Sequence, residues 1–270
     1  MLSNDILSDI EKYRLQGYII PHPSLVKTPE QLEGIRLSGR ITTEILDLLD
    51  REIKPGMTTA QIDKLVYDYT VDHSGIPATL NYNGFPKSVC TSINDVVCHG
   101  IPNDKTVLKS GDIVNIDVST ILNGFFSDAS RMYLIGEVSP KAKRLVKVTK
   151  ECLELGAGQV RPFGSTNDIG RAIEPYANQN GYTVVRDLGG HGVGLKFHEE
   201  PHIDHFEKSG KGVLMLPGMV FTVEPMINEG GYSVKIARDK WTITTRDGSL
   251  SAQWEYTIAV TKTGYEILAG

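Results

Sequence analysis

An Asn-Gly pair between two extended segments constrains the fold of this chain more than any other feature. Asn123-Gly124 separates the β-branched runs 112–120 and 125–134, and such a pair is the strongest short-range signal for a two-residue hairpin turn. Leu122 then pairs with Phe125, and counting outward from this pair sets the register of the hairpin. The sequence therefore predicts an antiparallel hairpin whose two faces can be assigned residue by residue.

Two aspartates fall on the same face of this predicted hairpin. Ser119 lies opposite Asp128 and Asp117 opposite Ser130, so the aspartates are diagonal neighbours about 7–8 Å apart at Cα. A lone aspartate in an apolar strand usually forms a salt bridge to Lys or Arg, because an unpaired buried charge is costly. Two such acids favour a metal ion instead, since close like charges raise each other's pKa unless a cation intervenes.

Two further acids and one histidine occur in comparable surroundings. Glu224 and Glu255 each lie in a predicted apolar strand, and His191 lies in a predicted glycine-rich turn whose backbone can approach another group closely. One imidazole and four carboxylates suit two divalent ions such as Mn²⁺, Fe²⁺, Co²⁺ or Zn²⁺. If the acids instead form structural salt bridges, the protein should show no dependence on metal.

The remaining pattern predicts two similar halves of the α+β class. Helices are expected over 3–16, 28–53, 58–75, 139–155 and 164–181, and extended segments over 88–98, 112–120, 125–134, 183–186, 219–224, 242–246 and 253–261. Ser3 is the expected cap of the first helix, and Thr28 and Thr58 each precede a Gln by three residues and predict capping boxes. The order helix, helix, strands occurs twice, which indicates an internal duplication around a mostly antiparallel sheet. We expect an N-terminal extension over 1–25 and one catalytic domain over 26–270.

Composition and missing motifs exclude several classes of protein. The net charge of −5, without a long basic run, argues against nucleic-acid binding. Cys90, Cys98 and Cys152 have no paired spacing, so neither a disulfide framework nor a zinc ribbon is indicated and a reducing cytoplasm is expected. Acidic residues interrupt the N-terminus where a signal peptide needs an apolar run, and no segment is long enough to span a bilayer. A monomer is the default expectation.

Seven segments carry a family resemblance: NYNGFPKSVCTSINDVVCHGIP, DIVNIDVST, GFFSDASRMY, GGHGVG, KFHEEPHI, FTVEPMI and QWEYTIAVT. In this order they resemble the type I methionine aminopeptidases over about residues 25 to 268. The resemblance implies the pita-bread fold, in which two pseudo-symmetric halves surround a curved, mostly antiparallel sheet. It also implies that two divalent ions are bound by Asp117, Asp128, His191, Glu224 and Glu255, with Asp117 and Glu255 as bidentate or bridging ligands.

The same resemblance implies an activity and a set of substrate contacts. The expected reaction is removal of the N-terminal methionine from nascent polypeptides, when the second residue is small, by metal-assisted hydrolysis of the first peptide bond. His99 and His198 would contact the substrate, and Glu224 would transfer the proton. A methionine pocket is expected from Tyr82, Phe85, Cys90, Phe197 and Trp241, and a monovalent cation site from Asn94, Val96 and Ser251.

Three questions stay open at the level of the sequence. The first two dozen residues either dock on the main body or contact a partner such as the ribosome. An Xaa-Pro-specific peptidase of the same fold is a rival, although such enzymes usually carry a large additional N-terminal domain. A non-catalytic peptide-binding relative is a second rival, but it would be expected to lose metal ligands, and all five are present.

Overall fold

The helices begin and end close to where their capping signals predict. The computed structural model describes the backbone of residues 4–270 and the side chains of residues 10–270. The helices are α1 (Asn4–Leu15), α2 (Pro29–Glu52), α3 (Thr59–Asp72), α4 (Pro140–Ala157) and α5 (Asn167–Gln179), with the short 3₁₀ helices η1 (Pro23–Leu25) and η2 (Tyr82–Gly84). Capping boxes form at Thr28 and Thr58 as expected. Ser3, the expected cap of α1, lies outside the described residues.

The strands pair antiparallel throughout the sheets of the described chain. They are β1 (Ile76–Pro77), β2 (Cys90–Ile93), β3 (Val96–Cys98), β4 (Ile113–Leu122), β5 (Phe125–Leu134), β6 (Thr183–Val184), β7 (Gly190–Gly192), β8 (Glu199–Ile203), β9 (Val220–Val223), β10 (Met226–Asn228), β11 (Val234–Ile236), β12 (Ile243–Thr245), β13 (Ser251–Gln253), β14 (Tyr256–Val260) and β15 (Tyr265–Ala269). Two groups matter for the site: β4 with β5, β1 and β2, and the five-stranded order β15-β14-β9-β7-β8.

The long hairpin has the predicted register. Leu122 pairs with Phe125, Ser119 with Asp128 and Asp117 with Ser130 along β4 and β5. Asn123 and Gly124 both adopt positive φ angles, 51° and 82°, as a type I′ turn requires. The predicted shared face of the two aspartates is therefore confirmed.

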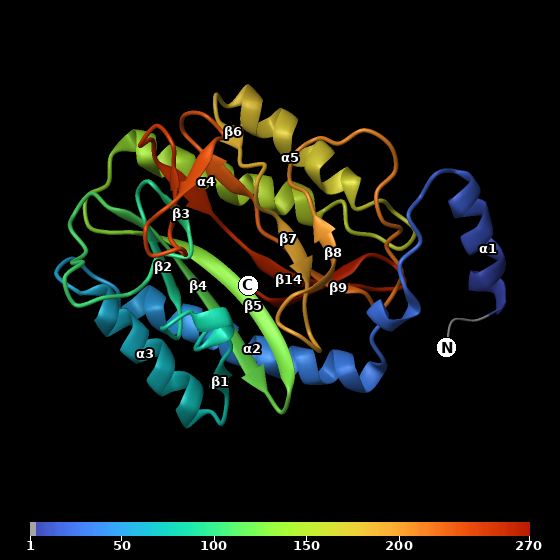
Figure 1. Cartoon of the computed structure of the whole chain (residues 1–270), viewed down its shortest axis with the longest axis horizontal. Helices are drawn as coiled ribbons and strands as arrows, with labels where there is room; N and C mark the ends of the chain where they lie inside the picture. Colours follow the sequence, from blue (N-terminus) through green and yellow to red (C-terminus); the bar gives the residue numbers. More distant parts are fainter. Residues whose placement is uncertain (1–3) are drawn as a thin grey trace.

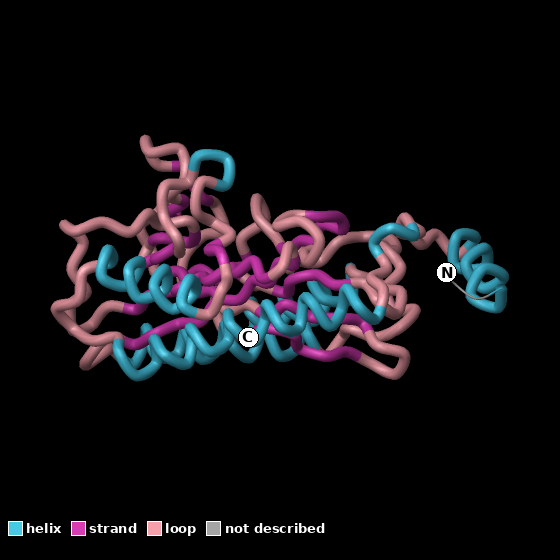
Figure 2. Tube along the Cα trace, turned by 90° about the horizontal axis from the view of Figure 1, so that it is seen from below, coloured by secondary structure: helices cyan, strands magenta, loops and turns pink. Residues whose placement is uncertain are grey.

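Two helix pairs cover the strands, one for each half of the chain. In Figure 1, α2 and α3 lie along one edge of the strands and α4 and α5 along the other. Helix α2 packs on β4 and β5, whereas α4 contacts α5, β13 and β10. Figure 2 shows these helices on one side of the strands, while loops and short strands rise on the other. This arrangement confirms the predicted α+β architecture of two similar halves.

Each half has its own hydrophobic core, and the hairpin contributes to both. One cluster joins α2 and α3 to the hairpin through side chains such as Leu46, Ile62 and Val118. The other packs α4 and α5 against the C-terminal strands, and it also includes Ile113 and Met132 at the far end of the hairpin. Because β4 and β5 belong to both cores, they hold the two halves in a fixed relation.

Several predicted strand positions were wrong. The run expected over 88–98 is divided into β2 and β3 by a turn at Asn94, whose φ is 55°. His191, expected in a turn, lies on the short strand β7. A β-carbon at Gly190 would lie 2.4 Å from the carbonyl oxygen of Thr222, and one at Gly192 would lie 2.1 Å from that of Glu200. These glycines therefore let β7 fit between β9 and β8.

The segment before α2 runs along the C-terminal half. Tyr13 stacks on Phe163 with ring centroids 5.7 Å apart, and Ile19 forms an isolated parallel bridge with Val213. Val26 then bridges to Met219. In the part of the chain that the structure describes, no helix combines the length and apolar character needed to cross a membrane.

Candidate metal centre

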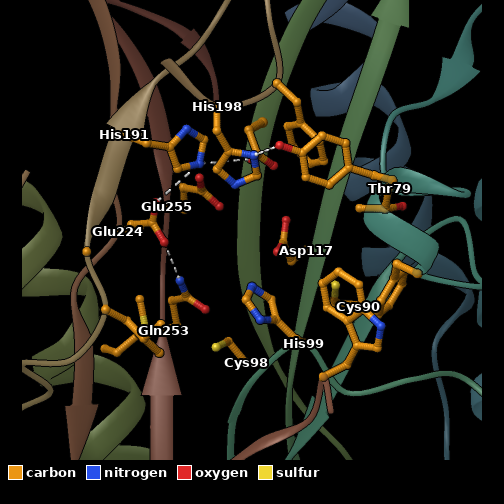
Figure 3. Close-up of a pocket in the computed structure, with 18 of the residues that line it drawn as sticks. Thr79, Cys90, Cys98, His99, Asp117, His191, His198, Glu224, Gln253 and Glu255 are labelled. Atoms are coloured by element: carbon orange, nitrogen blue, oxygen red, sulfur yellow. Dashed lines mark hydrogen bonds and ion pairs between the residues drawn. The ribbon is translucent and has the colours of Figure 1, made fainter. Parts of the chain in front are cut away.

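A cavity of about 470 Å³ contains all the predicted metal ligands and substrate-contacting side chains. The five predicted ligands lining it are Asp117, Asp128, His191, Glu224 and Glu255, and the other predicted residues lining it are Tyr82, Phe85, Cys90, Phe197, Trp241, His99 and His198. Figure 3 shows His191, Glu224 and Glu255 approaching from one side, with Asp117 farther across the pocket and His99 below it. Residues spread over most of the sequence thus converge on one space.

The hairpin supplies two of the acids. Asp117 of β4 and Asp128 of β5 are both enclosed in the cavity wall. The Ser119 hydroxyl donates to Asp128 Oδ1 at 2.8 Å, whereas Asp117 Oδ1 is buried and has no hydrogen-bond partner among the described residues. A buried carboxylate oxygen without a hydrogen-bond donor is suited to bind a cation.

His191 brings an imidazole to these acids from the other half. Its Nε2 lies 3.6 Å from Asp128 Oδ2 and 3.8 Å from Glu224 Oε1. One donor atom each from Asp128, His191 and Glu255 lie within 4.8 Å of one another. His191 Nδ1 lies 3.0 Å from the carbonyl oxygen of Gly192, so this nitrogen can donate there and leave Nε2 free as a ligand.

Glu224 and Glu255 lie at strand ends, which differs from the predicted positions inside strands. Glu224 follows β9 and Glu255 precedes β14. Ser130 forms an isolated bridge with Glu255, and the Thr257 hydroxyl donates to the carbonyl oxygen of Asp128 at 2.6 Å. These contacts join β5 to the C-terminal half at the level of the acids, so the ligands from the two halves are held together.

The four carboxyl groups crowd one another without an internal cation. Burial raises the pKa of Asp117 to about 6 and that of Glu224 to about 8. Burial also raises the pKa of Asp128 and Glu255 well above the usual range, and the neighbouring acids add to this effect. Among the described residues, the only ion-pair partner of this group is His191. Such a set fits divalent cations, which would stabilise the ionised form of every member.

Three histidines of the cavity, His99, His191 and His198, have lowered pKa values that favour the neutral imidazole. Burial lowers the pKa of His191 to about 3 and that of His99 to about 4, and it also lowers the pKa of His198. Neutral imidazole is the form that binds metal and the form that can donate one N–H to a substrate. His99 adopts a left-handed backbone conformation with φ at 56°.

Aromatic rings form the predicted pocket beside the acids. The rings of Phe85 and Trp241 meet edge to face at 5.3 Å, and those of Tyr82 and Phe197 at 4.8 Å. His198 Nδ1 lies 3.0 Å from the Tyr82 hydroxyl, and its ring centroid lies 4.1 Å from that of His191. An apolar pocket with a few convergent polar groups is typical of a small-molecule binding site.

The three predicted cation-site residues lie outside this cavity but near one another. The Ser251 amide donates to the carbonyl oxygen of Asn94 at 2.8 Å, and Val96 is on β3, which pairs with β12. The Ser251 hydroxyl is buried and has no partner among the described residues.

Sequence reasoning missed the side chains that support Glu224. The Thr222 hydroxyl accepts from the His191 amide at 3.0 Å and donates to Glu224 Oε1 at 2.7 Å. Gln253 Nε2 donates to Glu224 Oε2 at 3.0 Å, and His205 Nε2 accepts from the Glu224 amide at 3.0 Å. Thr222 lies two residues before Glu224, so strand alternation could have indicated it. His205 had no comparable local signal.

Comparisons with known proteins identify the family of this chain. The model of metallopeptidase family M24 matches residues 33–262. Methionine aminopeptidase A of Synechocystis sp. is 50% identical over 238 residues, which is 88% of this chain and 94% of that protein. The crystal structure of methionine aminopeptidase from Rickettsia prowazekii has a TM-score of 0.89 at 50% identity, covering 91% of this chain and 99% of that one.

A more distant relative has the same fold over its whole length. The crystal structure of methionine aminopeptidase from Thermotoga maritima has a TM-score of 0.88 at 36% identity, covering 90% of this chain and 98% of that one. The family match spans most of the sequence, and the acids and histidine predicted as ligands lie in one cavity. This chain therefore belongs to metallopeptidase family M24.

Proposed function

We propose that this protein removes the N-terminal methionine from newly made polypeptides by hydrolysing their first peptide bond. One observation carries the proposal: three buried carboxyl groups, the partly buried Asp117 and a neutral imidazole share a cavity with an aromatic pocket, in a chain about 50% identical to methionine aminopeptidases. The acids are suited to holding metal, and the adjoining rings are suited to a thioether side chain.

The residues present fit a pair of divalent ions. In this proposal the ligands are Asp117, Asp128, His191, Glu224 and Glu255, and the ion is Mn²⁺, Fe²⁺, Co²⁺ or Zn²⁺. When bound, such ions polarise a carbonyl group and lower the pKa of water toward about 7. The buried, unpartnered Asp117 Oδ1 supports this assignment.

The chain's own residues would orient the peptide and move the proton. Glu224, whose carboxylate is held by Thr222 and Gln253, would carry a proton from the attacking water to the departing amine. His198 would donate to the developing oxyanion, and His99 would orient the peptide from the opposite side of the cavity. The Tyr82 hydroxyl, 3.0 Å from His198 Nδ1, can donate to that nitrogen and so favour the tautomer whose proton is on Nε2.

Several finer features belong to the same proposal. Residues 26–270 would form the catalytic unit and residues 1–25 an extension, which contacts the C-terminal half through Tyr13 and Ile19. The enzyme would act in the cytoplasm on nascent chains, with the ribosome as a candidate partner and a small second residue in the substrate. Asn94, Val96 and Ser251 would hold a monovalent cation, and the buried Ser251 hydroxyl supports this.

The test is a metal-restoration assay with two classes of peptide. Purified protein is treated with chelator and then assayed on Met-Gly-type and Xaa-Pro-type peptides after addition of Mn²⁺, Fe²⁺ or Co²⁺. We expect methionine release to return with metal and to remain absent in Asp117→Asn. Cleavage of Xaa-Pro peptides alone would retain the family and change the substrate. Absence of activity with every metal would contradict the proposed function.

A further inference from the structure

A buried ion pair outside the cavity joins two distant parts of the chain. Lys27 Nζ contacts Glu199 Oε2, and the side chains are only 1% and 9% exposed. The residues are 172 positions apart in the sequence. A fully buried lysine is rare in proteins and needs a partner. A buried ion pair often adds little to the stability of a fold. The location of this pair in the molecule is therefore a better guide to its role.

The Glu199 carboxylate closes a tight turn at the rim of the cavity. Its Oε1 accepts the backbone N–H groups of Leu195 at 2.7 Å and Lys196 at 2.9 Å, while Oε2 contacts Lys27. Both oxygens are therefore used. The turn they close, residues 195–199, carries Phe197 and His198 into the cavity wall.

Lys27 is itself held firmly beneath this turn. Its amide donates to the carbonyl oxygen of Gly218 at 2.8 Å, and the next residue, Thr28, caps α2. A β-carbon at Gly194 would lie 2.4 Å from Ile35 Cδ1 and 3.5 Å from Lys27 Cε. The lysine stem and Ile35 thus pack directly against the backbone that leads into the turn.

The side chains of the turn face the reacting region. Phe197 stacks 6.2 Å from Phe126 and meets Tyr82 edge to face. His198 contacts the Tyr82 hydroxyl and lies beside the ring of His191, as Figure 3 shows. Nevertheless, His198 is itself exposed, so its place depends on how the backbone of the turn is held.

We propose that the Lys27–Glu199 pair is a positioning element for substrate recognition. It fixes the 195–199 turn to the start of α2, so that His198 faces the proposed metal cluster and Phe197 closes the methionine pocket. Neither residue of the pair touches substrate. This inference rests on the proposed methionine aminopeptidase function.

The main experiment removes both charges together, because removing one leaves the other buried and unpaired. In Lys27→Met/Glu199→Gln, the glutamine oxygen can still accept the two backbone N–H groups. We expect this variant to fold, to bind Mn²⁺ with unchanged affinity by calorimetry, and to release methionine with kcat lowered roughly 10- to 100-fold, the effect of a misplaced transition-state contact. A tetrahedral methionine phosphonate should lose affinity in parallel.

A matched control separates this role from general stabilisation. Arg36→Met/Glu266→Gln removes another long-range ion pair of α2, one that involves no residue lining the cavity. Its kcat should stay within about twofold of the unmodified protein. A folded Lys27→Met/Glu199→Gln variant with kcat and KM within about twofold would overturn the proposal, as would a loss of Mn²⁺ affinity proportional to the loss of activity.

A second variant keeps the proposal testable if the double variant fails to fold. Glu199→Asp retains the charge but shortens the side chain by one methylene group, so it draws the turn toward Lys27 without stranding a charge. We expect a smaller fall in kcat at unchanged Mn²⁺ affinity, and unchanged kcat would overturn the proposal. The proposed function fails separately, if the unmodified protein releases no methionine with any metal.

Discussion

Two buried acidic regions of this molecule neutralise their charge in different ways. Glu199 has its own cation, Lys27, and both side chains are almost completely enclosed. Within the part of the chain that the structure describes, the cavity acids, among them Asp128 and Glu224, have only the neutral His191 as an ion-pair partner. Where the chain provides a lysine, the carboxylate supports a turn. Where it provides none, a cation from solution would neutralise the carboxylates, as the proposed metal centre requires.

The strongest test of this comparison removes one cavity acid. We expect Asp128→Asn to lower kcat/KM for Met-Ala-Ser roughly a thousandfold or more, since metal ions contribute several kcal/mol to such reactions. Calorimetric titration should show weakened Mn²⁺ binding. Asp47→Asn, which removes an acid paired with Arg131, is the control and should leave activity within about twofold. Full activity in Asp128→Asn would show that this acid is not a ligand.

Removal of the internal cation should have a large effect on stability. Lys27→Met leaves Glu199 buried without a partner, which we expect to lower the free energy of unfolding by about 3–5 kcal/mol. Urea denaturation at pH 7 measures this. Lys64→Met, which breaks an exposed pair with Asp68, should change stability by less than about 1 kcal/mol. Equal effects of the two substitutions would contradict the distinction drawn here.

Loss of the hydrogen bond from Thr222 to Glu224 should weaken metal binding, but less than loss of a cavity acid. Thr222→Val removes the hydroxyl that joins the His191 amide to Glu224 Oε1, and we expect Mn²⁺ affinity to fall roughly 10- to 100-fold. Thr222→Ser keeps the hydroxyl and should bind nearly as well as the unmodified protein. If the serine variant were as weak as the valine variant, packing of the methyl group would be the cause.

The smallest expected effect is the change with pH in the free energy of unfolding of the metal-free protein. Burial raises the pKa of Glu224 to about 8 from an ordinary value of 4.5, so the folded state keeps a proton that the unfolded chain has released. The contribution of Glu224 to the free energy of unfolding should therefore fall as pH rises from about 6.5 to 8, by up to about 1 kcal/mol per pH unit, and then level off.

A comparison with Glu224→Gln isolates this acid from the other titrating groups. The histidines with lowered pKa values, such as His191, add stability as pH rises through their ordinary value of 6.5, whereas the raised pKa values of Asp128 and Glu255 act in the same direction as that of Glu224. Thermal unfolding in chelator, at steps between pH 6.5 and 8.5, measures both proteins. The Tm of the unmodified protein should fall relative to that of Glu224→Gln as pH rises, and bound Mn²⁺ should reverse this trend, whereas a constant difference in Tm would count against a raised pKa.

Local signals explain which parts of the fold were predictable. The Asn123-Gly124 turn fixes its own geometry, and so the register that places Asp117 beside Asp128 follows by counting. The capping boxes at Thr28 and Thr58 mark helix starts in the same way. In each case the residues that determine the structure are neighbours in the sequence.

The rest of the fold depends on contacts between residues far apart in the sequence, which local sequence patterns do not reveal. Gly190, His191 and Gly192 have little preference for a strand, and they form β7 because β9 and β8 lie on either side. The candidate ligands could be proposed as a set because each acid is unusual in its apolar setting and His191 lies in a glycine-rich segment. The Lys27–Glu199 pair could not be, since its members are 172 residues apart and Lys27 lies in none of the seven family segments.

The backbone at His99 also limits how this site can evolve. Its left-handed conformation, with φ at 56°, is accessible to histidine, asparagine, aspartate and glycine but strongly disfavours β-branched residues. A single nucleotide change that yields asparagine or aspartate would therefore preserve the fold while altering the chemistry of the pocket. Descendants of this chain that lose or change activity through this position should carry one of these side chains far more often than valine, isoleucine or threonine.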